Sequence, residues 1–139
     1  MPTLTSRKTS RAQMATLLGE ISTFVAVYDH RTNNIDGKSP VGMVHSDGSM
    51  QTFPDYLREW HRFIISLLWK RADDDATEDY IDDLAKDVRQ KLYDNVDEAG
   101  YWHDIEFDEE YSEMDYVLID GEQYRREMIR VAVLVVGGA

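Results

Sequence analysis

The chain has 139 residues, of which 42% are hydrophobic, so it is long enough for one domain with an ordinary core. It holds no cysteine, which excludes disulfides, thiolate metal sites and a cysteine nucleophile. No apolar run approaches the roughly 18 residues that a bilayer span needs, and the basic N-terminus lacks the apolar stretch of a secretory signal. We therefore expect one soluble globular domain, made inside a cell, with no membrane partner.

The net charge is −12, and it is distributed unevenly along the sequence. Residues 1–70 hold eight basic and six acidic side chains, a net charge of +2, whereas residues 71–139 hold seven and 21, a net charge of −14. An acidic chain repels phosphates, which argues against a sequence-specific nucleic-acid binder. The asymmetry favours association between oppositely charged patches of neighbouring subunits, and solubility explains it equally well.

The start of the sequence predicts an arm followed by a helix. Residues 1–9 are polar and aperiodic, so we expect a flexible basic arm ahead of a single domain over residues 10–139. Ser10 and Gln13 fit a capping box, and the apolar stripe behind them predicts a helix over about residues 11–21.

The next stretch predicts three strands. Residues 23–30 and 40–46 are rich in β-branched and aromatic side chains, and a polar loop separates them. The dipeptide Asp47-Gly48 then predicts a turn. Residues 56–72 fit both helical spacing and strand alternation. Because the run is aromatic and β-branched, we favour a strand over about residues 60–71.

A long helix and three more strands complete the pattern. A continuous apolar stripe predicts a helix over about residues 77–94, with acids crowding its N-terminus where the helix dipole favours them. Residues 102–108 alternate as a strand, and Asp120-Gly121 joins two apolar runs into a hairpin with a type I′ turn. The predicted fold class is α+β, a single domain with a mostly antiparallel sheet packed by two helices, in the order α-β-β-β-α-β-β-β.

No catalytic motif is present in the sequence: the nucleophile elbow, the P-loop, the dinucleotide fingerprint and the zinc-protease helix are all missing. The histidines are scattered, and a zinc site between His30 and His45 would need two more ligands. Alternating acids in residues 104–108 resemble the start of a calcium loop, but Glu109 stands where the loop needs glycine. We therefore expect a protein that is not an enzyme, with no cofactor and no dedicated metal site.

Three short motifs near the N-terminus, VYDH at residues 27–30, GKSPV at residues 37–41 and VHSDG at residues 44–48, precede a closing hairpin, DYVLIDGEQYR at residues 115–125. Together with the length and the element order, they resemble the tail terminator proteins, also called tail completion or minor tail proteins, of long-tailed bacteriophages. The resemblance covers roughly residues 12–136, and it carries over no catalytic residue.

The resemblance implies a virion protein, assembled in the host cytoplasm, at the head-proximal end of the tail. Such proteins are α+β, with a sheet backed by helices, and form a hexameric ring on the end of the tail tube. The ring stops tube polymerisation and presents a surface to the head. The implied partners are further copies of this chain, the major tail tube protein and the head completion or connector protein.

The charge pattern supplies candidate interface residues for such a ring, because a head-to-tail ring needs two different patches on each subunit. We expect the acidic patch at the start of the long helix, and the basic patch in and directly after the arm and around the start of the third predicted strand. The end of the last strand, residues 129–136, is expected to offer a free edge to a neighbour. The acidic candidates are Asp73, Asp74, Asp75, Glu78 and Asp79, and the basic candidates are Arg7, Lys8, Arg11, Arg58 and Arg62.

Other functions stay open at this point. The acidic second half fits an inhibitor that mimics nucleic acid and occupies a DNA-binding enzyme. Against that reading, the arm is basic, and lysines follow Asp82 and Asp87 at the i,i+4 spacing of helical ion pairs. Another phage neck or tail component fits the same pattern, and a small metal-dependent hydrolase lacks a recognisable site.

Overall fold

The computed structural model describes residues 4–51, 58–107 and 112–137. In chain order the elements of this part are α1 (Arg7–Gly19), β1 (Ala26–Tyr28), β2 (Val41–Gln51), β3 (Arg58–Lys70), α2 (Asp74–Asp94), β4 (Asp104–Phe107), β5 (Glu113–Ile119) and β6 (Glu122–Val136). The α+β class, the single domain and the predicted element order are confirmed. The long apolar run that fitted both helix and strand is strand β3, as favoured.

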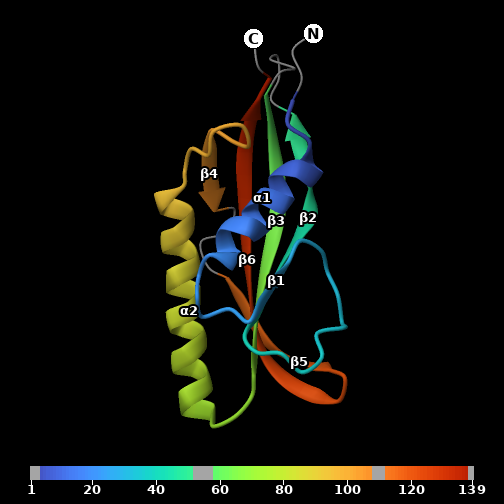
Figure 1. Cartoon of the computed structure of the whole chain (residues 1–139), viewed down its shortest axis with the longest axis vertical. Helices are drawn as coiled ribbons and strands as arrows, with labels where there is room; N and C mark the ends of the chain where they lie inside the picture. The colour runs from blue at the N-terminus through green and yellow to red at the C-terminus, as the bar shows by residue number, and fades with distance from the viewer. Residues whose placement is uncertain (1–3, 52–57, 108–111, 138–139) are drawn as a thin grey trace.

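One mixed sheet organises the molecule, with the strand order β1-β2-β3-β6-β4 and with β5 also paired to β6 (Figure 1). β1 runs parallel to β2, and the other pairings are antiparallel. The long pair β3–β6 extends from Arg58↔Val136 to Lys70↔Tyr124. The opposite side of β6 is divided between β5 and β4, so β6 is an interior strand. The expectation of a free edge at residues 129–136 is therefore wrong.

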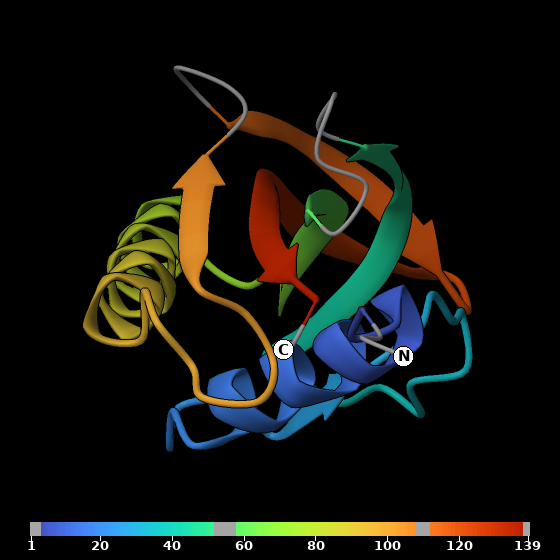
Figure 2. The same cartoon turned by 90° about the horizontal axis from the view of Figure 1, so that it is seen from above.

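The main core lies between the sheet and both helices, which cover the same face (Figures 1 and 2). Alternation in β6 follows the predicted period, since Ile129, Val131, Val133 and Val135 are all buried on this face. The apolar stripe of α2 meets them, with Ile81, Leu84, Val88 and Leu92 buried. Burial on one face of each element is what fixes the register of the sheet.

The other face of the sheet is covered only in part by the described residues. At one end, a smaller core forms where Ile35, in the loop between β1 and β2, packs with β-strand residues such as Met43, Leu68 and Tyr124. Toward the other end, Trp60 and Leu134 are half-buried, and the side chain of Met50 is 60% exposed. This part of the sheet therefore presents apolar side chains to its surroundings.

The first helix starts earlier than predicted. Ser6 caps it, because its side-chain oxygen accepts a hydrogen bond from the Thr9 N–H at 3.1 Å. Ser10, the expected cap, is fully buried and donates to the Tyr101 carbonyl at 3.2 Å. Residues 7–9 are thus helical, and the interpretation of them as part of an aperiodic arm is wrong; residues 1–3 lie outside the described part of the chain.

Two dipeptides with glycine behave differently. Asp120-Gly121 forms the predicted type I′ turn, with φ of +51° and +77° at its two residues. Asp47-Gly48, predicted as a turn, instead lies inside β2, where the register with β3 shifts between Ser46 and Ser49. Gly48 has a φ of +94°, so one extra residue in β2 forms a β-bulge and the strand continues. In the described part of the chain, neither helix is long and apolar enough to cross a membrane.

Candidate functional site

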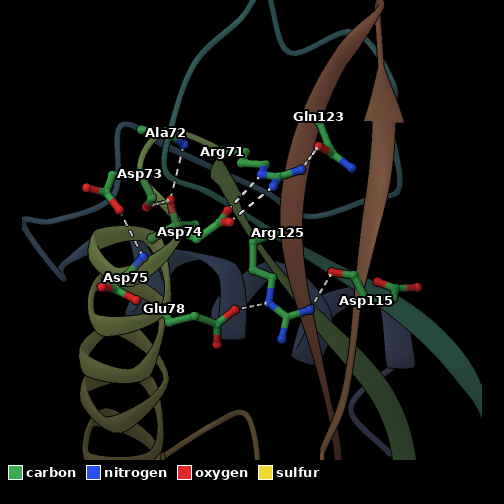
Figure 3. Close-up of polar contacts among 10 residues, drawn as sticks. Arg71, Ala72, Asp73, Asp74, Asp75, Glu78, Asp115, Gln123 and Arg125 are labelled. Carbon is green, nitrogen blue, oxygen red and sulfur yellow. Dashed lines mark hydrogen bonds and ion pairs between the residues drawn. The ribbon is translucent and has the colours of Figure 1, made fainter.

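The predicted acidic patch lies at the start of α2, where one of its members is a helix cap (Figure 3). Asp73 is the N-cap, and its carboxylate accepts from the Asp75 N–H at 3.1 Å. Thr77 strengthens this turn, because its hydroxyl donates to the Asp73 carbonyl at 2.8 Å and accepts from the Ala72 N–H at 3.1 Å. Asp73 therefore has a role within its own subunit.

Two further acids of the patch are paired inside the subunit. The Arg71 guanidinium donates to both carboxylate oxygens of Asp74, at 2.9 and 3.2 Å, and this hydrogen bonding raises the pKa of Arg71. Arg125 Nε lies 2.6 Å from Glu78 Oε1. Both guanidinium groups lie over the ring of Tyr116, at 5.3 and 4.7 Å from its centre. Asp75 and Asp79 are the exposed acids of the patch that these contacts do not use.

The basic candidates do not form one patch. On α1, Arg7 donates to Ser49 at 3.1 Å and Arg11 donates to Ser46 at 2.8 Å, so both hold the bulge of β2. Arg62 lies on the opposite face of the sheet, beside Met50 and Trp60. Of the two remaining candidates, Lys8 is exposed on α1, and Arg58 is exposed at the start of β3.

The acidic and basic groups lie at opposite ends of the long axis (Figure 1). β3 connects them, since it begins at Arg58 and ends at Lys70, three residues before the α2 cap. A strand of 13 residues spans about 40 Å, far beyond the Debye length of about 8 Å at physiological salt. The two groups therefore do not neutralise each other within one subunit.

Ser49 and His61 form a polar cluster that the sequence did not suggest. His61 is 3% exposed; its Nδ1 lies 2.9 Å from Ser49 Oγ, and its Nε2 lies 2.8 Å from the Thr5 carbonyl. A carbonyl only accepts, so Nε2 carries the proton and the Ser49 hydroxyl donates to Nδ1 in the neutral ring. Nε2 thus ties Thr5 to the sheet, while Nδ1 holds Ser49 of the neighbouring strand, which in turn accepts from Arg7. The pair has the composition of a catalytic dyad, but its contacts are structural.

A pocket of about 330 Å³ lies on the sheet face opposite the helices, between the β1–β2 loop and β5. Its floor is apolar, and cationic groups stand at its rim, so we call it the arginine-rimmed pocket. Arg126 at the rim is held by Asp115 through two hydrogen bonds of 2.8 and 2.6 Å. The floor includes Met43, Ile64, Leu68 and Met128, and the rim includes Arg31, His45 and Arg126.

Burial and three charged groups act on His45 at the rim of the arginine-rimmed pocket. Burial lowers the pKa of His45, the charges of Arg31 and Arg126 lower it further, and Asp47 partly opposes them. His45 is therefore neutral at pH 7, and Arg31 carries the unmatched charge of the rim, because Arg126 is paired with Asp115. Sequence reasoning missed this site because its residues come from separate segments. The usable signal was the alternation in β6, which puts Arg126 and Met128 on the face opposite Ile129.

Metal binding finds no support in the described residues. Within residues 4–51, 58–107 and 112–137, no three His, Asp or Glu side chains form a group that could hold a metal ion, and Asp108 and Glu109 lie outside these ranges. His30 contacts its neighbour Asp29 at 3.0 Å, and this hydrogen bond lowers the pKa of Asp29.

The chain matches no protein-family model and no curated protein sequence. The features that bear on its function are therefore its own: the acidic start of α2, a partly open sheet face and the arginine-rimmed pocket.

Proposed function

We propose that this protein is a structural virion component rather than an enzyme, namely the tail terminator of a long-tailed phage, assembled as a homohexameric ring. The observation that carries the proposal is the apolar surface that the monomer leaves exposed. Leu118 is 74% exposed, Met50 60% and Tyr93 59%. Contiguous apolar surface is typical of protein–protein contacts, and Met50 lies beside the half-buried Trp60 on the partly open sheet face.

The exposed apolar side chains belong to different elements, which suits contacts with more than one neighbour. Met50 is on β2 beside Trp60, Leu118 is on β5, and Tyr93 is near the end of α2. A closed ring needs a heterologous interface, in which two different surfaces of each subunit meet. The sequence resemblance and the α+β fold, a sheet backed by helices, support the same assignment.

The ring would sit at the head-proximal end of the tail, after assembly in the host cytoplasm. Its two faces would contact the major tail tube protein and the head completion or connector protein. The net charge of −12 suits a lumen that lets DNA pass without binding it.

Sedimentation velocity of the purified chain over a concentration series tests the proposal. We expect a hexamer, or growth toward one with concentration. Added to polymerising tail tube protein, the assembled ring is expected to stop tube growth and to cap one end in electron micrographs. A chain that stays monomeric at every concentration and leaves tube length unchanged would overturn the proposal.

A second candidate function, mimicry of nucleic acid, is favoured by the outer surface of α2. Exposed acids follow one another along this helix, among them Asp75, Asp79, Asp82, Asp83 and Asp87. The lysine partner expected for Asp87 is engaged elsewhere, because Lys91 Nζ pairs with Glu20 Oε1 at 2.9 Å. A mimic would remain small in the same sedimentation experiment and bind a basic DNA-binding protein in a salt-sensitive way.

A further inference from the structure

The arginine-rimmed pocket has the shape and charge to receive one apolar side chain that is accompanied by carboxylates. Its volume is about 330 Å³, and Met43, Leu68 and Met128 contribute to an apolar floor. The charge of Arg126 is already matched by Asp115. Arg31 is exposed at the rim and makes no ion pair within the described part of the chain, so it supplies the unmatched positive charge.

The same chain carries a side chain of that kind near the end of α2. Tyr93 is 59% exposed, although its ring contacts Phe107 at a centre-to-centre distance of 5.4 Å. Asp94 follows it directly, and the nearby Asp97 is also exposed. Tyrosine is favoured as an interface anchor, because it brings a large apolar area with little conformational entropy to lose.

Tyr93 and the pocket lie on opposite sides of one subunit. α2 packs on the face of the sheet that holds the main core (Figures 1 and 2). The residues that line the pocket belong to the other face, to β5 and to the β1–β2 loop. A subunit therefore cannot fill its own pocket. A contact between two copies would be head-to-tail, and repetition of such a contact gives a ring where the rotation between copies closes and an open filament where it does not.

We propose that the arginine-rimmed pocket is the socket of a self-assembly interface, which receives Tyr93 of a second copy of this chain while Arg31 pairs with the carboxylates of Asp94 and Asp97 in that copy. The inference rests on the proposed function, since it identifies the surfaces through which the ring forms. Tyr93 supplies the buried apolar area, and Arg31 sets the orientation.

Sedimentation velocity of full-length variants over a concentration series tests the interface. We expect Tyr93→Ala and Arg31→Glu each to raise the dissociation constant of self-association at least tenfold. The matched controls are Tyr80→Ala and Lys86→Glu, which are expected to associate like the wild type. Tyr80 is an exposed aromatic on the same helix that stacks on Trp69 at 4.9 Å, and Lys86 is an exposed cation on that helix. Circular dichroism and thermal melts verify that each variant is folded.

A charge exchange makes the test specific. Asp94→Arg with Asp97→Arg is expected to weaken association alone and to restore it when combined with Arg31→Glu. If the wild type assembles and the Tyr93 and Arg31 variants assemble equally well, the proposed interface is wrong. The proposed ring is not contradicted by that result. A wild type that never assembles removes both the interface and the proposed function. Weakening by Arg31→Glu without any effect of Tyr93→Ala would mean that the pocket takes another occupant, which also overturns the inference.

Discussion

Arg89 on α2 donates a hydrogen bond of 3.1 Å to the carboxylate of Glu127 on β6, and Glu127 is only 4% exposed. The Ser112 hydroxyl donates to the same carboxylate oxygen at 2.6 Å. A buried carboxylate without partners is costly, so these two contacts explain how a charge is kept between the long helix and the sheet.

Arg89→Met is expected to lower the free energy of unfolding by about 2 kcal/mol, because it leaves the Glu127 charge buried with one partner fewer. Adding Glu127→Gln should recover part of the loss, since a neutral amide is less costly to bury than a carboxylate. Urea unfolding measures both values. Lys86→Met, at an exposed position one turn earlier on α2, serves as the control and should change stability by less than about 0.5 kcal/mol. An Arg89→Met variant as stable as this control would contradict the role of the pair.

Gly121→Val is expected to cost about 1–2 kcal/mol of folding stability. Gly121 has a φ of +77° in the type I′ turn between β5 and β6, and a β-branched side chain is strained in that conformation. Gly19→Ala is the matched control. An added Cβ at Gly19 meets no atom within 4 Å, and alanine favours the helix, so stability should hold or rise slightly. Thermal melts that show equal stability for Gly121→Val and the wild type would mean that the turn tolerates the substitution.

Short-range sequence patterns correctly predicted α2 and the hairpin of β5 and β6, because interactions between residues close in sequence determine both. The stripe of α2 repeats over several turns, and an Asp-Gly pair between apolar runs leaves few alternatives to a tight hairpin. The sequence of β3 was ambiguous, because its apolar residues fit both the helical period and the alternation of a strand. What makes it a strand is its pairing with β2 on one side and β6 on the other, which is a property of the whole sheet.

The errors share a physical cause, which is that distant segments decided the outcome. Ser10 looks like a cap in sequence, yet burial against Tyr101 moves the start of α1 to Ser6. The end of β6 was predicted to be an edge, because the strand that pairs with it, β4, comes from a distant part of the chain. The candidate interface acids could be placed at a helix start, but their pairing with Arg71 and Arg125 depends on tertiary structure. The arginine-rimmed pocket could be recognised only from the fold, because its residues come from separate segments of the chain.

Asp73→Ala is expected to destabilise the monomer by about 1 kcal/mol, because it removes the N-cap of α2. Asp73→Asn keeps a capping oxygen and removes only the charge, so it should be nearly neutral. Comparing the two variants distinguishes a role of Asp73 as a helix cap from a role as an interface charge. If Asp73 acts as an interface charge, Asp73→Asn would weaken self-association in sedimentation while leaving the melting temperature unchanged. If it acts only as a cap, Asp73→Ala alone would lower the melting temperature.

The stability of the protein is expected to fall on acidification from about pH 7.5 to about pH 5, in part because of His45. Burial, together with the charges of Arg31 and Arg126, lowers the pKa of His45 in the folded state, and Asp47 only partly offsets this. Below the ordinary histidine pKa of about 6.5, the unfolded chain therefore binds more protons at this position than the folded chain. The stabilisation by neutral His45 is complete above that pKa, and it is lost as the pH falls through the lower, folded-state pKa.

His45→Gln should accordingly flatten the pH dependence of the free energy of unfolding over this range, measured by urea titration at each pH. Arg31→Gln should flatten it in part, because it removes one of the charges that lower the pKa of His45. His103, an exposed histidine, provides the control, and His103→Gln should leave the slope as in the wild type. Both substitutions remove one imidazole. If the free energy of unfolding then has the same pH dependence in His45→Gln and His103→Gln, the surroundings of His45 in the pocket do not contribute to it. If the free energy of unfolding depends less on pH in His45→Gln and in Arg31→Gln, but not in His103→Gln, the acid sensitivity arises from His45 and Arg31 at the rim of the arginine-rimmed pocket.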